Sequence, residues 1–94
     1  MRTTKTAPIK IVRRPEVLER FGYGKTCLHS RVKSGLVPAP CQLGGRSVGW
    51  IDHEIDVVIS ALAAGQTDEE IKALVKLLVA RRSEHAELLR GLFA

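Results

Sequence analysis

The sequence has little cysteine and no long hydrophobic run. Two cysteines, Cys27 and Cys41, are too few for the disulfide framework that holds many small secreted domains together. No apolar run approaches the roughly 20 residues that a membrane span requires. No apolar signal core follows the charged residues 1–5. We therefore expect a soluble cytoplasmic protein with reduced thiols.

Acidic residues are scarce in the first half of the chain. Residues 1–50 contain ten Lys or Arg against only Glu16 and Glu19, a net charge of +8. Residues 51–94 contain five basic and eight acidic residues, a net charge of −3. A strongly basic half is typical of a surface that binds a polyanion such as nucleic acid. The chain has 94 residues, 45% of them hydrophobic and 27% charged, which predicts one small globular domain rather than a disordered chain.

Proline and glycine positions predict two short helices joined by a tight turn. Pro15 suits the first turn of a helix, where its missing N–H costs nothing, and Gly22 ends that helix. A second helix is expected over residues 25–34, with Gly35 closing it in the left-handed conformation. Two such helices form a helix-turn-helix.

A β-hairpin is predicted directly after the second helix. Pro38 and Pro40 prevent the helix from continuing and hold the chain extended. Residues 41–51 form two short apolar segments around the turn Gly-Gly-Arg-Ser, which predicts a hairpin with Arg46 at its tip. A hairpin in this position is the wing of a winged helix-turn-helix. We expect Trp50 to pack between this wing and the core.

The second half of the chain predicts two further helices. Asp52 is expected to cap the first of them, and Gly65 ends it. Its predicted buried stripe consists of Ile55, Val58, Ile59 and Leu62. Thr67 and Glu70 have the spacing of a capping box, which starts a second helix reaching the C-terminus.

An apolar stripe follows this last helix and is expected to contact a partner. Its members are Ile71, Leu74, Val75, Leu78, Leu88, Leu89 and Leu92. About 23 helical residues make a rod of roughly 35 Å, which is long for so small a core. Arg82 and His85 interrupt the heptad spacing, so a regular coiled coil is not expected. The helix either folds back on its own domain or binds another copy or an integrase, and the length of the rod favours self-association.

Three stretches place proline, glycine, arginine and tryptophan at characteristic spacings. They are residues 14–18 (Arg-Pro-Glu-Val-Leu), 35–40 (Gly-Leu-Val-Pro-Ala-Pro) and 43–50 (Leu-Gly-Gly-Arg-Ser-Val-Gly-Trp). In this combination the chain resembles the AlpA family, small phage and mobile-element regulators similar to excisionases and to the DNA-binding domain of MerR proteins. The resemblance covers residues 10–63.

The chain departs from the family pattern within the second predicted helix and just before it. Gly24 and Cys27 stand where the family usually has Ser and Thr, and His29 and Arg31 stand where aromatic and apolar residues are usual. These departures therefore bear on the DNA target rather than on the fold.

The resemblance implies a mainly α fold with a small β-hairpin wing. It places a winged helix-turn-helix DNA-binding domain at residues 10–64. The polar residues before it predict a flexible arm at residues 1–9. The C-terminal helix at residues 67–94 exceeds the shortest family members and is not carried over from the family. Its length and apolar stripe predict oligomerisation or partner contact. The resemblance also implies a bacterial protein that lies at the nucleoid when it is bound to DNA.

Two functions stay open. The resemblance implies a sequence-specific protein for double-stranded DNA, which acts as an excisionase (recombination directionality factor), as a transcriptional regulator, or as both. Its protein partner would then be a tyrosine integrase or RNA polymerase. The alternative is a protein-interaction module that acts through the C-terminal helix, with incidental basic charge.

The candidate DNA contacts lie on the outward face of the second helix, on the wing and before the first helix. Base contacts are expected from Thr26, His29 and Ser30, phosphate contacts from Lys25 and Lys33, and either kind from Arg31. Arg46 is expected to enter the minor groove or hold a phosphate. Arg13 and Arg14 are expected to approach the backbone.

Other kinds of site find little support in the sequence. Cys27, His29, Cys41 and His53 match no common closed zinc site, and no metal or other cofactor is indicated. The acidic residues that follow Ile51 are explained by a capped, solvated helix start. No serine has a plausible histidine and acid partner, so we do not expect an enzyme.

Overall fold

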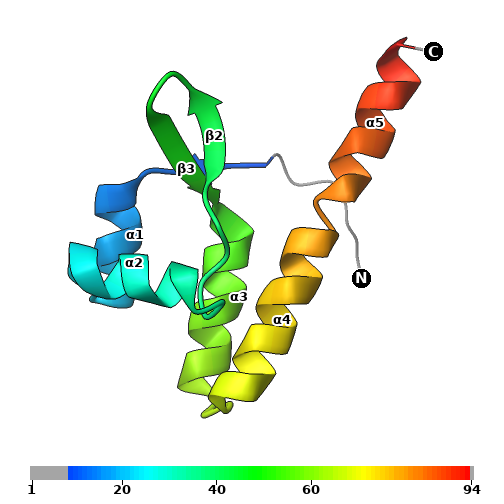
Figure 1. Ribbon diagram of the computed structural model, residues 1–94. Coiled ribbons are helices and arrows are strands. Elements are labelled where there is room, and N and C mark those ends of the chain that lie inside the picture. The colour runs from blue at the N-terminus through cyan, green and yellow to red at the C-terminus, as the bar shows by residue number, and fades with distance from the viewer. Residues whose placement is uncertain (1–8, 94) are drawn as a thin grey trace.

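The computed structural model describes residues 9–93 and is mainly helical, with a small antiparallel sheet (Figure 1). Residues 1–8 of the predicted arm lie outside the described residues. The predicted fold class, a winged helix-turn-helix followed by a long C-terminal helical segment, is confirmed. The elements in chain order are β1 (Ile11–Val12), α1 (Arg14–Phe21), α2 (Lys25–Lys33), β2 (Cys41–Gly44), β3 (Ser47–Ile51), α3 (Asp52–Ala63), α4 (Asp68–Ala80) and α5 (Ser83–Phe93).

The sheet joins the wing to the start of the domain. Its strand order is β1-β3-β2, all antiparallel, with Val12 opposite Trp50 and Cys41 opposite Gly49. A Cβ atom at Gly49 would lie 2.4 Å from Cγ2 of Ile11. Only glycine therefore allows β1 and β3 to pack this closely at the base of the wing.

A first core cluster holds α1, α2, the sheet and α3 together. Its buried members are Val12, Val17, Leu28, Val37, Trp50 and Ile55. The indole Nε1 of Trp50 donates a hydrogen bond of 3.0 Å to the carbonyl oxygen of Pro38. This bond anchors the segment between α2 and the wing, and it confirms the predicted core role of Trp50.

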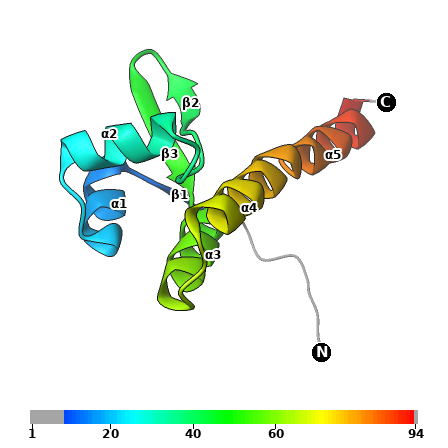
Figure 2. The ribbon, with the colours of Figure 1, turned by 60° about the horizontal axis from the view of Figure 1, so that its bottom comes forward.

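A second core cluster packs α4 against α3. Its buried members are Leu36, Val58, Ala61, Ile71 and Val75, with Leu74 and Leu78 half-buried against them. The capping box of Thr67 and Glu70 is present at the start of α4, as predicted. Figures 1 and 2 both show α4 lying beside α3. The first half of the C-terminal segment therefore folds back on its own domain.

The C-terminal segment is divided into two helices instead of forming one continuous rod. Around Arg81 and Arg82 the backbone hydrogen bonds span three residues: Glu84 N–H donates to Arg81 O, and His85 N–H donates to Arg82 O, both at 3.0 Å. α-Helical bonds span four residues, so the regular ladder is interrupted here. Beyond this point none of the residues of α5 is buried, and α5 projects from the rest of the molecule (Figure 2).

Two details of α3 correct the sequence prediction. Ile51, rather than Asp52, occupies the capping position, and no side chain caps the helix. The Asp52 carboxylate instead accepts a bond from Arg20. Leu62, predicted as buried, is 37% exposed, because α4 covers the face of α3 formed by Val58 and Ala61. Within the described part of the chain, no helix is long and apolar enough to cross a membrane.

Candidate nucleic-acid interface

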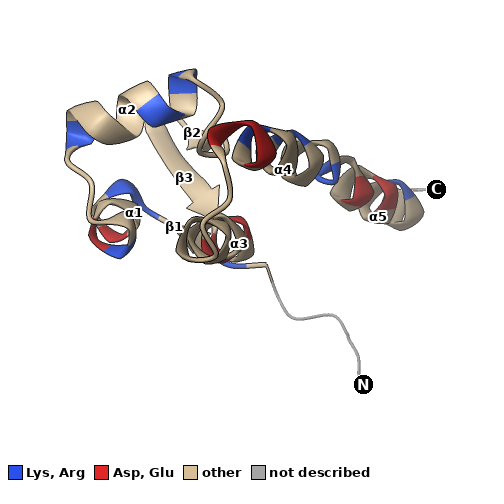
Figure 3. Cartoon of the chain, turned by 90° about the horizontal axis from the view of Figure 1, so that it is seen from below, with Lys and Arg blue, Asp and Glu red and all other residues tan. Residues whose placement is uncertain are grey.

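Helix α2 buries one side in the domain and exposes the other. Leu28 is 2% exposed, and Val32 is half-buried against the same core cluster. The predicted contact residues Lys25, Thr26, His29, Ser30 and Lys33 are all exposed. The helix contains no acidic residue, and in Figure 3 its ribbon carries the colour of lysine and arginine but not that of aspartate and glutamate. This face has the charge and the free side chains that contact with a nucleic acid requires.

The wing carries Arg46 beyond the body of the domain. The turn before it uses Gly44 at φ +112° and Gly45 at φ +56°, a backbone conformation that strongly favours glycine. Arg46 is exposed at the tip, as predicted. The hairpin thus presents a guanidinium group on a narrow two-stranded projection.

Four cationic residues come together between α1, α2 and the wing. Arg13, Arg14, Lys25 and Arg46 line a groove of about 430 Å³ whose other walls are Pro15, Leu18 and Val48. Among the residues that the structure describes, no carboxylate lines this groove. Uncompensated cations on three different elements create a positive potential directed at one concave surface. We refer to this surface as the cationic groove.

Two of these cations are held in place by the domain itself. The Nε atom of Arg13 donates a 3.0 Å hydrogen bond to the carbonyl oxygen of Val48 on the wing. The guanidinium of Arg14 lies over the Trp50 ring, 5.8 Å from its centroid, which is a cation–π distance. Both side chains therefore lose less rotamer freedom on binding an anion than free surface arginines would.

The predicted site residues are not all in one place. His29 lines a second, smaller cavity of about 280 Å³, which shares Arg14 and Lys25 with the cationic groove. Arg31 lies elsewhere: it is half-buried with its guanidinium 5.5 Å from the centroid of the Tyr23 ring. In the structure Arg31 therefore packs against the turn between α1 and α2.

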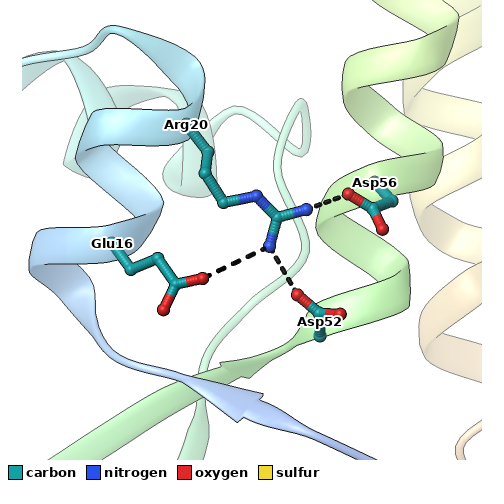
Figure 4. A network of polar contacts seen from close by, with 4 residues as sticks. All are labelled: Glu16, Arg20, Asp52 and Asp56. Atoms are coloured by element: carbon teal, nitrogen blue, oxygen red, sulfur yellow. Dashed lines mark hydrogen bonds and ion pairs between the residues drawn. The ribbon is translucent and has the colours of Figure 1, made fainter.

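Arg20 is a structural cation and was not among the predicted DNA contacts. Figure 4 shows it between Glu16 of its own helix and the carboxylates of Asp52 and Asp56 on α3. The Nη1 atom of Arg20 lies 2.5 Å from Oδ1 of Asp52. Two of the acidic residues read as a solvated helix start therefore join α3 to α1. The Glu16 spacing of four residues was the only local sign of this network.

Arg82 and Glu54 form an ion pair that was not predicted from the sequence either. Glu54 is 2% exposed, and its carboxylate accepts two bonds from Arg82: 2.6 Å from Nη2 and 3.0 Å from Nε. Nη2 also donates to the carbonyl oxygen of Ala39 at 2.8 Å. The hydrogen bond to Glu54 raises the pKa of the Arg82 guanidinium above its ordinary value, so the group keeps its charge throughout the neutral range. Arg82 therefore ties the end of α4 to α3 and to the segment that carries the wing.

The predicted partner-contact stripe is divided by the fold. Ile71 and Val75 are buried against α3, with Leu74 and Leu78 half-buried beside them. Only Leu88, Leu89 and Leu92 remain exposed, all on α5. A partner would therefore meet the second half of the stripe and not the first.

The residues considered for zinc do not assemble into a site. Cys27 is exposed on α2, and Cys41 is half-buried on β2. Over residues 9–93, no three His, Cys, Asp or Glu side chains come together as a metal ion would require.

Comparison with known proteins identifies relatives of one part of the chain. A family model described as "Prophage CP4-57 regulatory protein (AlpA)" matches residues 10–60. The uncharacterized protein ORF88 of enterobacteria phage P4 is 26% identical over 57 residues, which cover 61% of this chain and 65% of the phage protein. The matched part thus spans less than two thirds of that relative. No solved structure matches the chain. Residues 10–60 include every residue of the cationic groove, but neither Arg82 nor α5.

Proposed function

This chain belongs to the AlpA family of prophage regulatory proteins, and on that premise we propose that it is a sequence-specific DNA-binding protein of a phage or mobile element. The coarse part of this function, a phage-type regulatory protein, follows from the family. The target, the mode of contact and the biological process are the proposal.

The cationic groove is the observation that carries the proposal. It lies beside the exposed face of α2, so one duplex can meet both surfaces. In a winged helix-turn-helix the second helix enters the major groove, with its early residues at the base edges. Thr26, His29 and Ser30 would then read bases, while Lys25 and Lys33 hold phosphates on either side.

The wing and the start of α1 would contact the duplex outside the major groove. Arg46 would enter the neighbouring minor groove or hold a phosphate. Arg13 and Arg14, fixed by the wing and by Trp50, would bind the backbone between the wing and α2. Arg31 would reach DNA only by leaving Tyr23.

The process in which this binding acts has two versions. As an excisionase, the protein would bind repeated sites beside an attachment site, bend the DNA and favour excision by a tyrosine integrase. As a transcriptional regulator, it would bind a promoter and recruit or block RNA polymerase. Tandem direct repeats near an integrase gene support the first version, and a lone operator supports the second. In both, copies of the protein would associate on DNA or through the C-terminal helix.

Binding to fragments from around the native gene tests the proposal. Fluorescence anisotropy against unrelated competitor DNA, at two salt concentrations, is expected to show binding that survives competitor and weakens with salt. Arg46→Ala and Lys33→Ala should each weaken binding about tenfold, because each removes a charged contact. Each should also lower the slope of log K against log salt by about 0.9.

Arg81→Ala is the matched control, because it removes one exposed positive charge at the end of α4. It should bind as the unaltered protein does. Weak binding that is equal for all fragments, with no loss in the Arg46 and Lys33 variants, would contradict the proposal.

A second candidate function rests on α5. Its unburied apolar face supports a protein-interaction module in which the basic half is incidental. Under this alternative, Arg46→Ala and Lys33→Ala would leave biological activity intact.

A further inference from the structure

Helix α5 exposes an apolar face that none of the described residues 9–93 covers. Leu88 and Leu92 are 68% and 77% exposed, and Leu89 and Phe93 are 54% and 86% exposed. Both pairs are four residues apart, so the four side chains lie on one side of the helix. Glu84 lies one turn before Leu88, at the edge of this face.

An apolar groove lies on the same molecule, between α4 and the end of α2. It has a volume of about 620 Å³. Its floor includes the buried Val37 and Val75, and Val79, which is 37% exposed, lies at one end. Lys72 and Lys76 line it with exposed ammonium groups, and Glu69 adds an exposed carboxylate at the end opposite Val79.

The helix cannot occupy the groove of its own chain. Only Arg81 and Arg82 separate α5 from α4, and the groove runs along α4 itself. Arg82 is also held by Glu54, which fixes the direction in which α5 leaves (Figure 2). Any copy of α5 in the groove must therefore come from another molecule.

Helix and groove match in length, polarity and charge. The 11 residues of α5 make a rod of about 16 Å, and the α4 wall from Glu69 to Val79 has the same length at the same rise per residue. With α5 antiparallel to α4, Glu84 comes close to Lys76, at the end of the groove near Val79. The apolar face then lies on the valine floor.

We propose that α5 of one copy docks in the groove between α2 and α4 of a second copy. Two different surfaces meet in this contact, so each copy offers one helix and one groove, and copies can join head-to-tail. Its one short helix buries less than a standard stable interface, so neighbouring binding sites on DNA would strengthen it by raising the effective concentration. That consequence rests on the proposed DNA-binding function, but the contact itself does not.

Mixing two disabled variants tests the contact without DNA. The helix variant carries Leu88→Asp and Leu92→Asp, and the groove variant carries Lys76→Glu and Val79→Asp. All four side chains are exposed, and circular dichroism and Trp50 fluorescence check that both variants fold. In sedimentation velocity the unaltered chain should form dimers and longer species with rising concentration. Each variant alone should associate at least about tenfold more weakly, a loss of roughly 1.4 kcal/mol.

The mixture should recover one contact and stop at a heterodimer, because the intact α5 of the groove variant meets the intact groove of the helix variant. A groove variant that still associates alone, with no gain on mixing, would show α5 pairing with itself and overturn the proposal. An unaltered chain that stays monomeric at every concentration would overturn it as well.

A charge exchange repeats the test with two single changes at exposed positions. Lys76→Glu and Glu84→Lys should each weaken association, and their mixture should restore it. Failure of the mixture to recover would contradict the antiparallel placement of Glu84 beside Lys76. Because no DNA is present, these outcomes are independent of the DNA-binding test.

Discussion

At the scale of single residues, the partners of each arginine decide whether its positive charge stays free or is neutralised by a carboxylate. Arg46 is exposed at the wing tip, and Arg14 rests on Trp50 beside the cationic groove. Arg20 and Arg82 instead neutralise carboxylates inside the domain. The basic excess of the first half therefore overstates the number of cations free for a polyanion. Over the described residues, most of the free cations of the first half lie in the groove and on the face of α2.

The pair of Arg82 and Glu54 should be the most costly ion pair to break. Arg82→Ala leaves the Glu54 carboxylate buried at 2% exposure without its partner, which is expected to lower the free energy of unfolding by roughly 3 kcal/mol. Urea denaturation followed by Trp50 fluorescence measures this.

The double variant Glu54→Met/Arg82→Met should recover much of that loss, because it removes the buried charge together with its partner. A single Arg82→Ala variant as stable as the unaltered chain would show that the pair is not a structural tie.

At the scale of elements, the sequence predicted those helices and strands whose signals lie within a few residues of their boundaries. The helices α1 and α2 and the wing follow from prolines and glycines within a few residues of each boundary, and the capping box of α4 is a spacing of three. The division between α4 and α5 was not predictable in this way, because it coincides with a contact between Arg82 and Glu54, 28 positions apart. The interruption of the apolar stripe at Arg82 was the one local sign.

The same distinction between local signals and long-range contacts applies to the candidate site. The exposed face of α2 and the position of Arg46 follow from helix and hairpin geometry, and the structure places them as expected. The approach of Arg13 and Arg14 to the wing depends on how β1 pairs with β3 and where Trp50 packs. Those are long-range contacts, which periodicity within one segment does not encode.

The wing should depend on the glycine at its base. Gly49→Ala places a methyl group 2.4 Å from Ile11 Cγ2, and overpacking of this kind is expected to cost about 1–3 kcal/mol. Thermal unfolding of the variant measures the loss.

Adding Ile11→Ala to Gly49→Ala should restore part of the stability, because it removes the atom that clashes. Gly91→Ala on α5, where no atom lies within 4 Å of the new methyl group, is the matched control and should not destabilise the chain. Equal effects of the two glycine substitutions would rule out the close approach of β1 and β3.

At the scale of the whole molecule, the chain has two surfaces of different chemistry. The cationic groove and α2 lie within residues 10–60, the part that the AlpA family model matches. The apolar face of α5 lies outside that part and projects from the body of the domain (Figure 1). Arg82, which joins α3 and the segment before the wing to the base of α5, sits between the two. The proposed DNA contact and the proposed contact of α5 therefore involve separate parts of the chain.

The most direct test of DNA binding is a backbone amide NMR titration of the full chain with a native duplex that holds a single site. The largest shift changes are expected in α2, in the turn at residues 44–47 and at Arg13 and Arg14, with α5 unchanged. Changes confined to α5, or small changes spread evenly over all lysines and arginines, would contradict the cationic groove and α2 as the DNA-binding surface.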